Sequence, residues 1–140
     1  MKKFEFIDIT TADVAFEAYG KSLNELFTNA ALATFEVMVN TKQIKPEIKK
    51  TVEIRAEDLK SLLFDWLNEL LVFYGSENLA FSKFEVKVDE EKMELKAALY
   101  GEKIDIKKHE VRTEVKAATY HKMEIEKLNG KWKAKVIVDI

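Results

Sequence analysis

Hydrophobic residues recur at every third or fourth position in two segments of the chain, a spacing that gathers side chains on one face of an α-helix. The first segment follows Ser22, in an S-L-N-E capping box where the Ser22 hydroxyl accepts from the backbone N–H of Glu25. The second begins near Ala56, has two acidic residues in its first turn and is expected to end at Gly75. We therefore predict two amphipathic helices, whose apolar faces consist of Leu23, Leu26, Phe27, Ala30, Ala31, Phe35 and Met38, and of Leu59, Leu62, Leu63, Trp66, Leu67, Leu70, Leu71 and Tyr74.

Most of the remaining chain alternates apolar and polar residues one by one, as a half-buried β-strand does. This alternation is clear in residues 84–88 and 93–99, which a short turn separates. Near the C-terminal end, Asn129 and Gly130 form the preferred two-residue hairpin turn, because both positions of that turn require a positive φ. The sequence predicts an α+β fold: a largely antiparallel or mixed β-sheet with two amphipathic helices packed on one face.

The hairpin fixes which residues lie opposite one another on its two strands. Pairing outward from the turn brings oppositely charged side chains together twice, which supports this register. The expected pairs are Leu128 with Lys131, Glu126 with Lys133, and Glu124 with Lys135.

Continuing the same register outward predicts the surroundings of Asp139. Tyr120 is expected opposite Asp139, and His121 is expected to point toward the core. If the strand continues unbroken, Lys116 and Ala118 share the face of Asp139.

Two carboxyl groups are expected at the end of this strand, one from Asp139 and one from the terminal residue Ile140. With a third oxygen ligand they would suit a hard divalent cation. Asp13 is a candidate for that ligand, since the chain has no Lys or Arg within four residues of it. Its alternative is a turn aspartate that accepts hydrogen bonds from nearby backbone amides.

Composition limits the classes of protein to which the chain belongs. Its 140 residues, 47% hydrophobic and 34% charged, predict one globular domain over residues 1–140. Because cysteine is absent, thiolate metal sites and a cysteine nucleophile are excluded. No apolar run approaches membrane-spanning length, so we expect a soluble cytoplasmic protein. The net charge of −2 does not indicate a generic polyanion binder, and four glycines with no Gly-rich loop argue against nucleotide binding.

Three segments, TADVAFEAYGKSLNELFTNAALATFEVM, LLFDWLNELLVF and EVKAATYHKMEIEK, together with the closing VIVDI, resemble the archease family. The similarity runs from about Phe4 to Ile140. It implies an accessory protein rather than an enzyme. This protein would activate the tRNA-splicing RNA ligase RtcB by promoting its guanylylation and multiple turnover, and would contact tRNA only through the ligase.

The resemblance also assigns roles to single residues. It implies that Asp13, Asp139 and Ile140 bind a divalent metal. Calcium is the expected ion, with manganese or magnesium as alternatives. It implies that Lys116 is needed for activation of the ligase. The family's opening motif has a histidine where this chain has Thr10, a departure that leaves a set of oxygen ligands.

Two other functions fit particular features of the sequence. The basic segment 103–116 suits an RNA-binding or chaperone-like helper of tRNA modification, although a solvated loop around His109 explains the same residues. A metal-dependent hydrolase using Asp13 and Asp139 ranks last, because the sequence places no histidine or other general base beside them.

Overall fold

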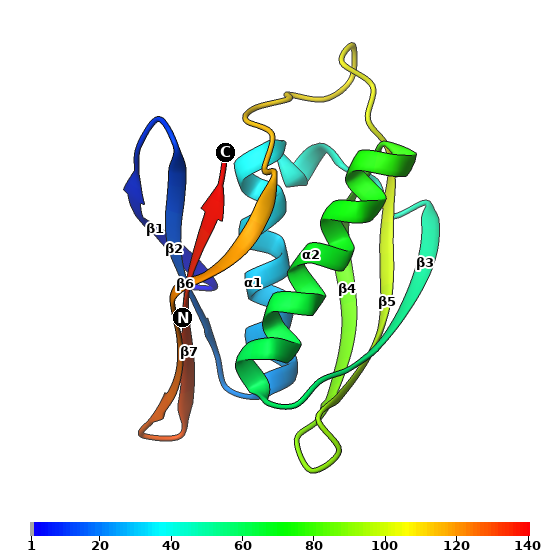
Figure 1. The fold of residues 1–140 in the computed structure, drawn as a ribbon. Helices are drawn as coiled ribbons and strands as arrows, with labels where there is room; N and C mark the ends of the chain where they lie inside the picture. Colours follow the sequence, from blue (N-terminus) through cyan, green and yellow to red (C-terminus); the bar gives the residue numbers. More distant parts are fainter. Residues whose placement is uncertain (1) are drawn as a thin grey trace.

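Two antiparallel sheets enclose two α-helices in the computed structural model, which describes residues 2–140 (Figure 1). The first sheet has the strand order β1-β2-β7-β6, and the second has the order β3-β5-β4. Along the chain the elements are β1 (Phe4–Ile9), β2 (Asp13–Gly20), α1 (Leu23–Met38), the 3-10 helix η1 (Thr41–Gln43), β3 (Ile48–Arg55), α2 (Leu59–Glu77), β4 (Leu79–Asp89), β5 (Glu94–Lys103), β6 (Ala117–Leu128) and β7 (Lys131–Asp139).

The α+β class, the antiparallel pairing and the two helices are as the sequence predicts. The strands form two sheets rather than one. The two helices lie between the sheets and pack against the inner face of both (Figure 1). Apolar side chains from both sheets and both helices make one core, including Phe16, Phe27, Phe35, Trp66 and Phe81. In residues 2–140, no helix has the length and apolar character needed to cross a membrane.

The helix ends follow their capping residues. Ser22 caps α1 and accepts from the backbone N–H of Glu25 at 3.1 Å, as the capping box predicts. Asp58 caps α2 in the same way. The prediction that this helix ends at Gly75 is wrong, because the helix continues through that residue and stops at Asn78, whose φ of 57° is the left-handed conformation of a C-cap.

The C-terminal hairpin confirms the predicted turn and its first pairs. Asn129 and Gly130 both have positive φ, and all three expected pairs are present. Farther from the turn the register changes between Thr119 and Glu124, so that four residues of β6 lie opposite Val136 alone. This bulge includes Lys122, whose φ is 54°.

The bulge overturns three predictions for β6. Ala117, not Tyr120, lies opposite Asp139. His121 is exposed rather than part of the core. Ala118 lies opposite Val138 on the buried face, so it does not share the face of Asp139.

The segment between β5 and β6 crosses one end of the molecule, over both helices (Figure 1). The prediction of a solvated His109 is wrong, because its imidazole is buried and its Nε2 lies 2.7 Å from a carboxylate oxygen of Glu102. Its Nδ1 accepts from the backbone N–H of Asp105, so Nε2 carries the proton and donates to Glu102. Burial raises the pKa of Glu102, but hydrogen bonds from the Lys45 backbone, from His109 and from Lys108 outweigh it and lower that pKa to about 2.

Candidate metal-binding site where the chain ends meet

Asp13 and Asp139 lie directly opposite each other on the neighbouring strands β2 and β7. The backbone N–H of Ile140 donates to the carbonyl of Ala12 at 3.0 Å, so that pair is the hydrogen-bonded one. The adjoining Asp13–Asp139 pair is therefore of the non-hydrogen-bonded type, in which Cα atoms lie about 4.5 Å apart and side chains are closest. Both carboxylates project from the outer face of the sheet, since Val14 and Val138 beside them are buried. The expected meeting of the two chain ends is thus confirmed.

The turn before β2 holds Asp13 in place. The hydroxyl of Thr10 accepts from the backbone amides of Ala12 and Asp13 at 3.1 and 3.0 Å. The same hydroxyl lies 3.1 Å from the Asp13 carboxylate, to which it can donate. Thr10 therefore accepts the backbone hydrogen bonds that Asp13 would accept if it were a turn aspartate. In residues 2–140 the Asp13 carboxylate accepts from the Thr10 hydroxyl and from no backbone amide.

Lys116 is joined to this site through the main chain. Its backbone N–H donates to the carbonyl of Asp139 at 2.8 Å, one residue before β6 begins. Its side chain is exposed, and in the described chain no carboxylate lies within ion-pair distance of its ammonium group. Figure 1 shows β7 ending between the β1–β2 hairpin and the start of β6, where Asp13 begins β2, Asp139 ends β7 and Lys116 precedes β6.

Helix α2 fixes the start of β6 from the inner side. The Asn68 amide oxygen accepts from the backbone N–H of Ala118 at 2.9 Å, and its nitrogen donates to the carbonyl of the same residue at 3.3 Å. Phe64, one helical turn away, stacks on Tyr120 with ring centroids 4.2 Å apart. Sequence reasoning missed Asn68, although a polar residue between the apolar positions Leu67 and Leu70 is a signal for such a contact.

The charges at this site are unbalanced. In residues 2–140, neither Asp13 nor Asp139 forms an ion pair, and directly opposite like charges destabilise a pair of strands. Two carboxylates with nearby main-chain oxygens are the donors that calcium prefers. The described side chains include no group of three or more metal-binding residues. A hard cation bound by Asp13 and Asp139 would therefore take its further ligands from the main chain, from water or from a partner.

Two cations of the basic segment 103–116 are neutralised within the molecule. Lys108 pairs with the buried Glu102, and Arg112 pairs with Glu36 at 2.7 Å and with Glu110 at 2.6 Å. The guanidinium of Arg112 also donates to the Glu36 carbonyl, which fastens this segment to α1. These pairs leave less free positive charge than the sequence suggested, and they weaken the case for an RNA-binding role of this segment.

These features define a class: a small α+β protein with two helices between antiparallel sheets and an acidic pair where its terminal strands meet. The sequence profile described as the Archease protein family (MTH1598/TM1083) matches residues 4–140. The chain belongs to the archease family, as the resemblance of its motifs predicts.

Individual relatives agree with this assignment. Protein archease of Sulfurisphaera tokodaii is 48% identical over 140 residues, with complete coverage of both chains. The solution structure of Methanobacterium thermoautotrophicum protein 1598 has 50% identity, a TM-score of 0.87 and complete coverage of both chains. The crystal structure of a Thermotoga maritima archease, described as a possible chaperone, has 26% identity and a TM-score of 0.65, with 94% of this chain and 93% of that chain covered.

Proposed function

We propose that this protein is a non-catalytic activator of the tRNA-splicing RNA ligase RtcB in the cytoplasm, promoting ligase guanylylation and multiple turnover. Membership of the archease family supports the choice of partner. The observation that carries the proposal is the facing pair of Asp13 and Asp139, which no cation in the described chain neutralises. Binding of a cation or of a cationic partner would remove this repulsion.

Asp13, Asp139 and a main-chain oxygen of Ile140 would hold the metal ion. A set of oxygen donors suits calcium, and manganese or magnesium are the alternatives. Once bound, a divalent ion neutralises the two carboxylates and presents positive charge to phosphate oxygens. The chain's own contribution is to fix the carboxylates, Asp13 through Thr10 and Asp139 through the backbone of Lys116.

Lys116 supplies a second cation, one residue before the position opposite Asp139. Because its ammonium group has no carboxylate partner in the described chain, it is available to a phosphate or to an acidic side chain of the ligase. Its backbone bond to Asp139 fixes its position relative to the carboxylates. We propose that the metal and Lys116 together engage the ligase close to its nucleotide.

The test is a turnover experiment. Purified RtcB, GTP, manganese and RNA halves with cyclic-phosphate ends are incubated with and without this protein, and ligated RNA per ligase molecule is counted. We expect about one ligation per ligase alone and many in the presence of the protein. Equal counts in the two reactions would refute the proposed function.

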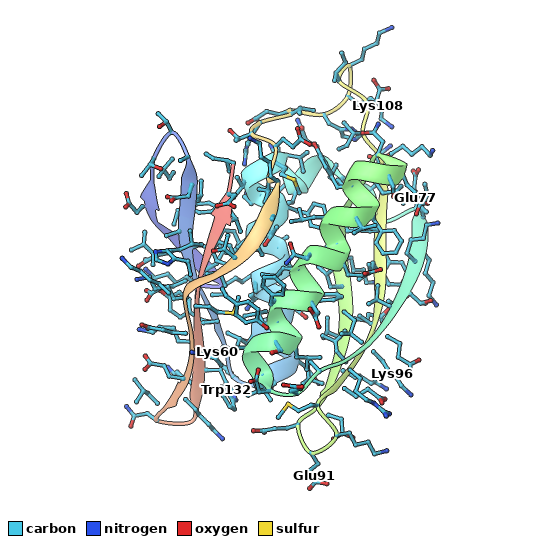
Figure 2. The ribbon with its side chains drawn as sticks, viewed as in Figure 1. Lys60, Glu77, Glu91, Lys96, Lys108 and Trp132 are labelled. Atoms are coloured by element: carbon cyan, nitrogen blue, oxygen red, sulfur yellow. The ribbon has the colours of Figure 1, made fainter. Side chains whose placement is uncertain are left out.

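Two variants separate the roles of the metal and the lysine. Asp139→Asn is expected to lose both calcium binding, measured by calorimetry, and activation. Lys116→Gln is expected to keep calcium binding and lose activation. Glu91→Gln, at the exposed β4–β5 turn (Figure 2), changes the net charge as Asp139→Asn does and serves as the matched control.

A further inference from the structure

The outer face of the second sheet carries two rows of lysines. In the first row, Tyr100 on β5 lies between Lys49 on β3 and Lys83 on β4. In the second row, Lys96 on β5 lies between Lys87 on β4 and Glu53 on β3. The rows are four residues apart along β5, which corresponds to about 13–14 Å. All four lysines are exposed, and Figure 2 shows Lys96 on the side of the sheet away from the helices.

This arrangement of charge is unfavourable in the protein alone. Like charges directly opposite each other on neighbouring strands are destabilising, and Lys87 and Lys96 form such a pair. In residues 2–140, no carboxylate lies within 4.0 Å of the ammonium groups of Lys49, Lys83 or Lys87. Lys96 has one partner, Glu94, at 3.6 Å. The face therefore offers several cations to an anionic ligand.

Tyr100 adds an aromatic surface between two of these cations. The ammonium groups of Lys83 and Lys49 lie 5.0 and 5.9 Å from the centre of its ring. A hydrogen bond to Glu85 raises the pKa of the Tyr100 hydroxyl. An aromatic ring flanked by lysines is the arrangement on which single-stranded nucleic acids stack a base and place their phosphates.

A groove of about 780 Å³ reaches both rows and is lined by Lys49 and Tyr100 from the first and by Lys87 and Lys96 from the second. Its floor is made of small side chains, Thr51 and Ala98, which leave room between the rows. Two acidic residues, Glu53 and Glu85, also line it, so the groove is not uniformly basic. Glu85 lies opposite Ala98 in the middle of the groove and directs a phosphate to the two rows, whereas Glu53 lies opposite Lys96 within the second row.

We propose that this groove binds a short segment of single-stranded RNA, with one base on Tyr100 and phosphates at the two lysine rows. The aromatic ring favours RNA over an acidic peptide, because a peptide carboxylate would use the lysines and leave the ring unused. A duplex is a poorer fit, since its bases are already stacked on one another. The groove lies on a different sheet from the Asp13–Asp139 pair, so the proposal does not rest on ligase activation.

The experiment measures binding of a fluorescein-labelled eight-nucleotide oligouridylate by anisotropy, with the protein alone in EDTA. We expect binding that weakens with salt, and weaker binding of an RNA duplex of the same length. Lys87→Gln/Lys96→Gln and Lys49→Gln/Lys83→Gln are each expected to weaken binding and to lower the salt slope by about 1.4, the value for two lost contacts to a single strand. Tyr100→Leu is expected to weaken binding about 5-fold or more, whereas Tyr100→Phe keeps the ring and the affinity.

The matched control is Lys60→Gln/Lys131→Gln, which removes the same charge from exposed positions outside the groove (Figure 2 labels Lys60). Circular dichroism checks that each variant is folded. The proposal is overturned if the oligonucleotide does not bind up to about 100 μM protein at low salt. Equal affinities of the groove and control variants overturn it as well. The proposal is also overturned if a polyglutamate peptide displaces the RNA and Tyr100→Leu leaves the affinity for RNA unchanged. Because RtcB and metal are absent, none of these results depends on the proposed function.

Discussion

Replacing Asp139 with asparagine is expected to make the metal-free protein more stable while it removes the response to calcium. Asp13 and Asp139 face each other across β2 and β7, and the described chain provides neither with an ion-pair partner. Asparagine keeps the shape of the side chain and removes one of the two charges. The substitution therefore relieves a repulsion in the folded state without opening a cavity, since Asp139 is exposed.

The size of both effects follows from the geometry. Directly opposite like charges on neighbouring strands cost about 0.2–1 kcal/mol, and solvent exposure favours the lower half of this range. For a chain of 140 residues, 1 kcal/mol corresponds to about 3 °C in Tm, so the metal-free variant should melt about 1–2 °C higher. Calcium at about 100 times its Kd should stabilise the wild-type protein by about 2.7 kcal/mol, or about 8 °C, and the variant much less.

The assay is thermal unfolding followed by circular dichroism, in EDTA and in calcium, at low and high salt. Salt should reduce the increase in Tm that Asp139→Asn causes in EDTA, because salt screens the repulsion between the two carboxylates. The double variant with Asp13→Asn should gain less than the sum of the single variants, since one substitution already removes the repulsion. Glu91→Gln should change Tm in neither buffer. A lower Tm of Asp139→Asn in EDTA, or an equal calcium response of variant and wild type, would refute this reasoning.

Four further predictions concern the structure outside the acidic pair. The lowered pKa of Glu102 gives stability that is fully present above pH 4.5 and is lost as the pH falls toward 2; Glu102→Gln should flatten this dependence in acid-unfolding curves. Asn68→Ala should cost about 1–3 kcal/mol and speed hydrogen exchange at the Ala118 amide, because two backbone groups lose their partner. Gly75→Ala should raise stability by up to about 1 kcal/mol, since a methyl group there meets no atom within 4 Å. Gly101→Ala should lower stability by about 3 kcal/mol or more, because its Cβ would lie 1.8 Å from a backbone oxygen. Urea unfolding measures both glycine effects.

Local features of the sequence were sufficient to predict the helices and the C-terminal hairpin. Capping at Ser22 depends on residues three positions apart, and the turn at Asn129 depends on two adjacent residues. Such signals are complete within a short window of sequence, so no knowledge of the fold is needed to interpret them. The same window misled the prediction for the end of α2, where glycine at position 75 is only a tolerated helix residue and Asn78 is the cap.

Pairings between distant segments were harder to predict from the sequence. Whether the strands make one sheet or two depends on how the helices fill the space between them, and no periodicity along the chain encodes that. The buried position of His109 depends on Glu102 and on the Asp105 backbone, which surround it only after the loop has folded over the end of β5. The facing of Asp13 and Asp139 was foreseen because family motifs pointed to both residues, not because either residue stood out locally.

The bulge in β6 shows why the site needs the whole fold. The Asn129–Gly130 turn fixes the register at one end of the β6–β7 pair, and Asn68 fixes β6 to α2 at the other end. The two registers differ by three residues, and the bulge takes up the difference. An unbroken strand would place Tyr120 opposite Asp139 and displace Lys116 by about 10 Å along the strand. The backbone bond from Lys116 to Asp139 therefore exists because the bulge shortens the path of β6, so the contact of α2 with that strand helps to place the Lys116 backbone beside that of Asp139.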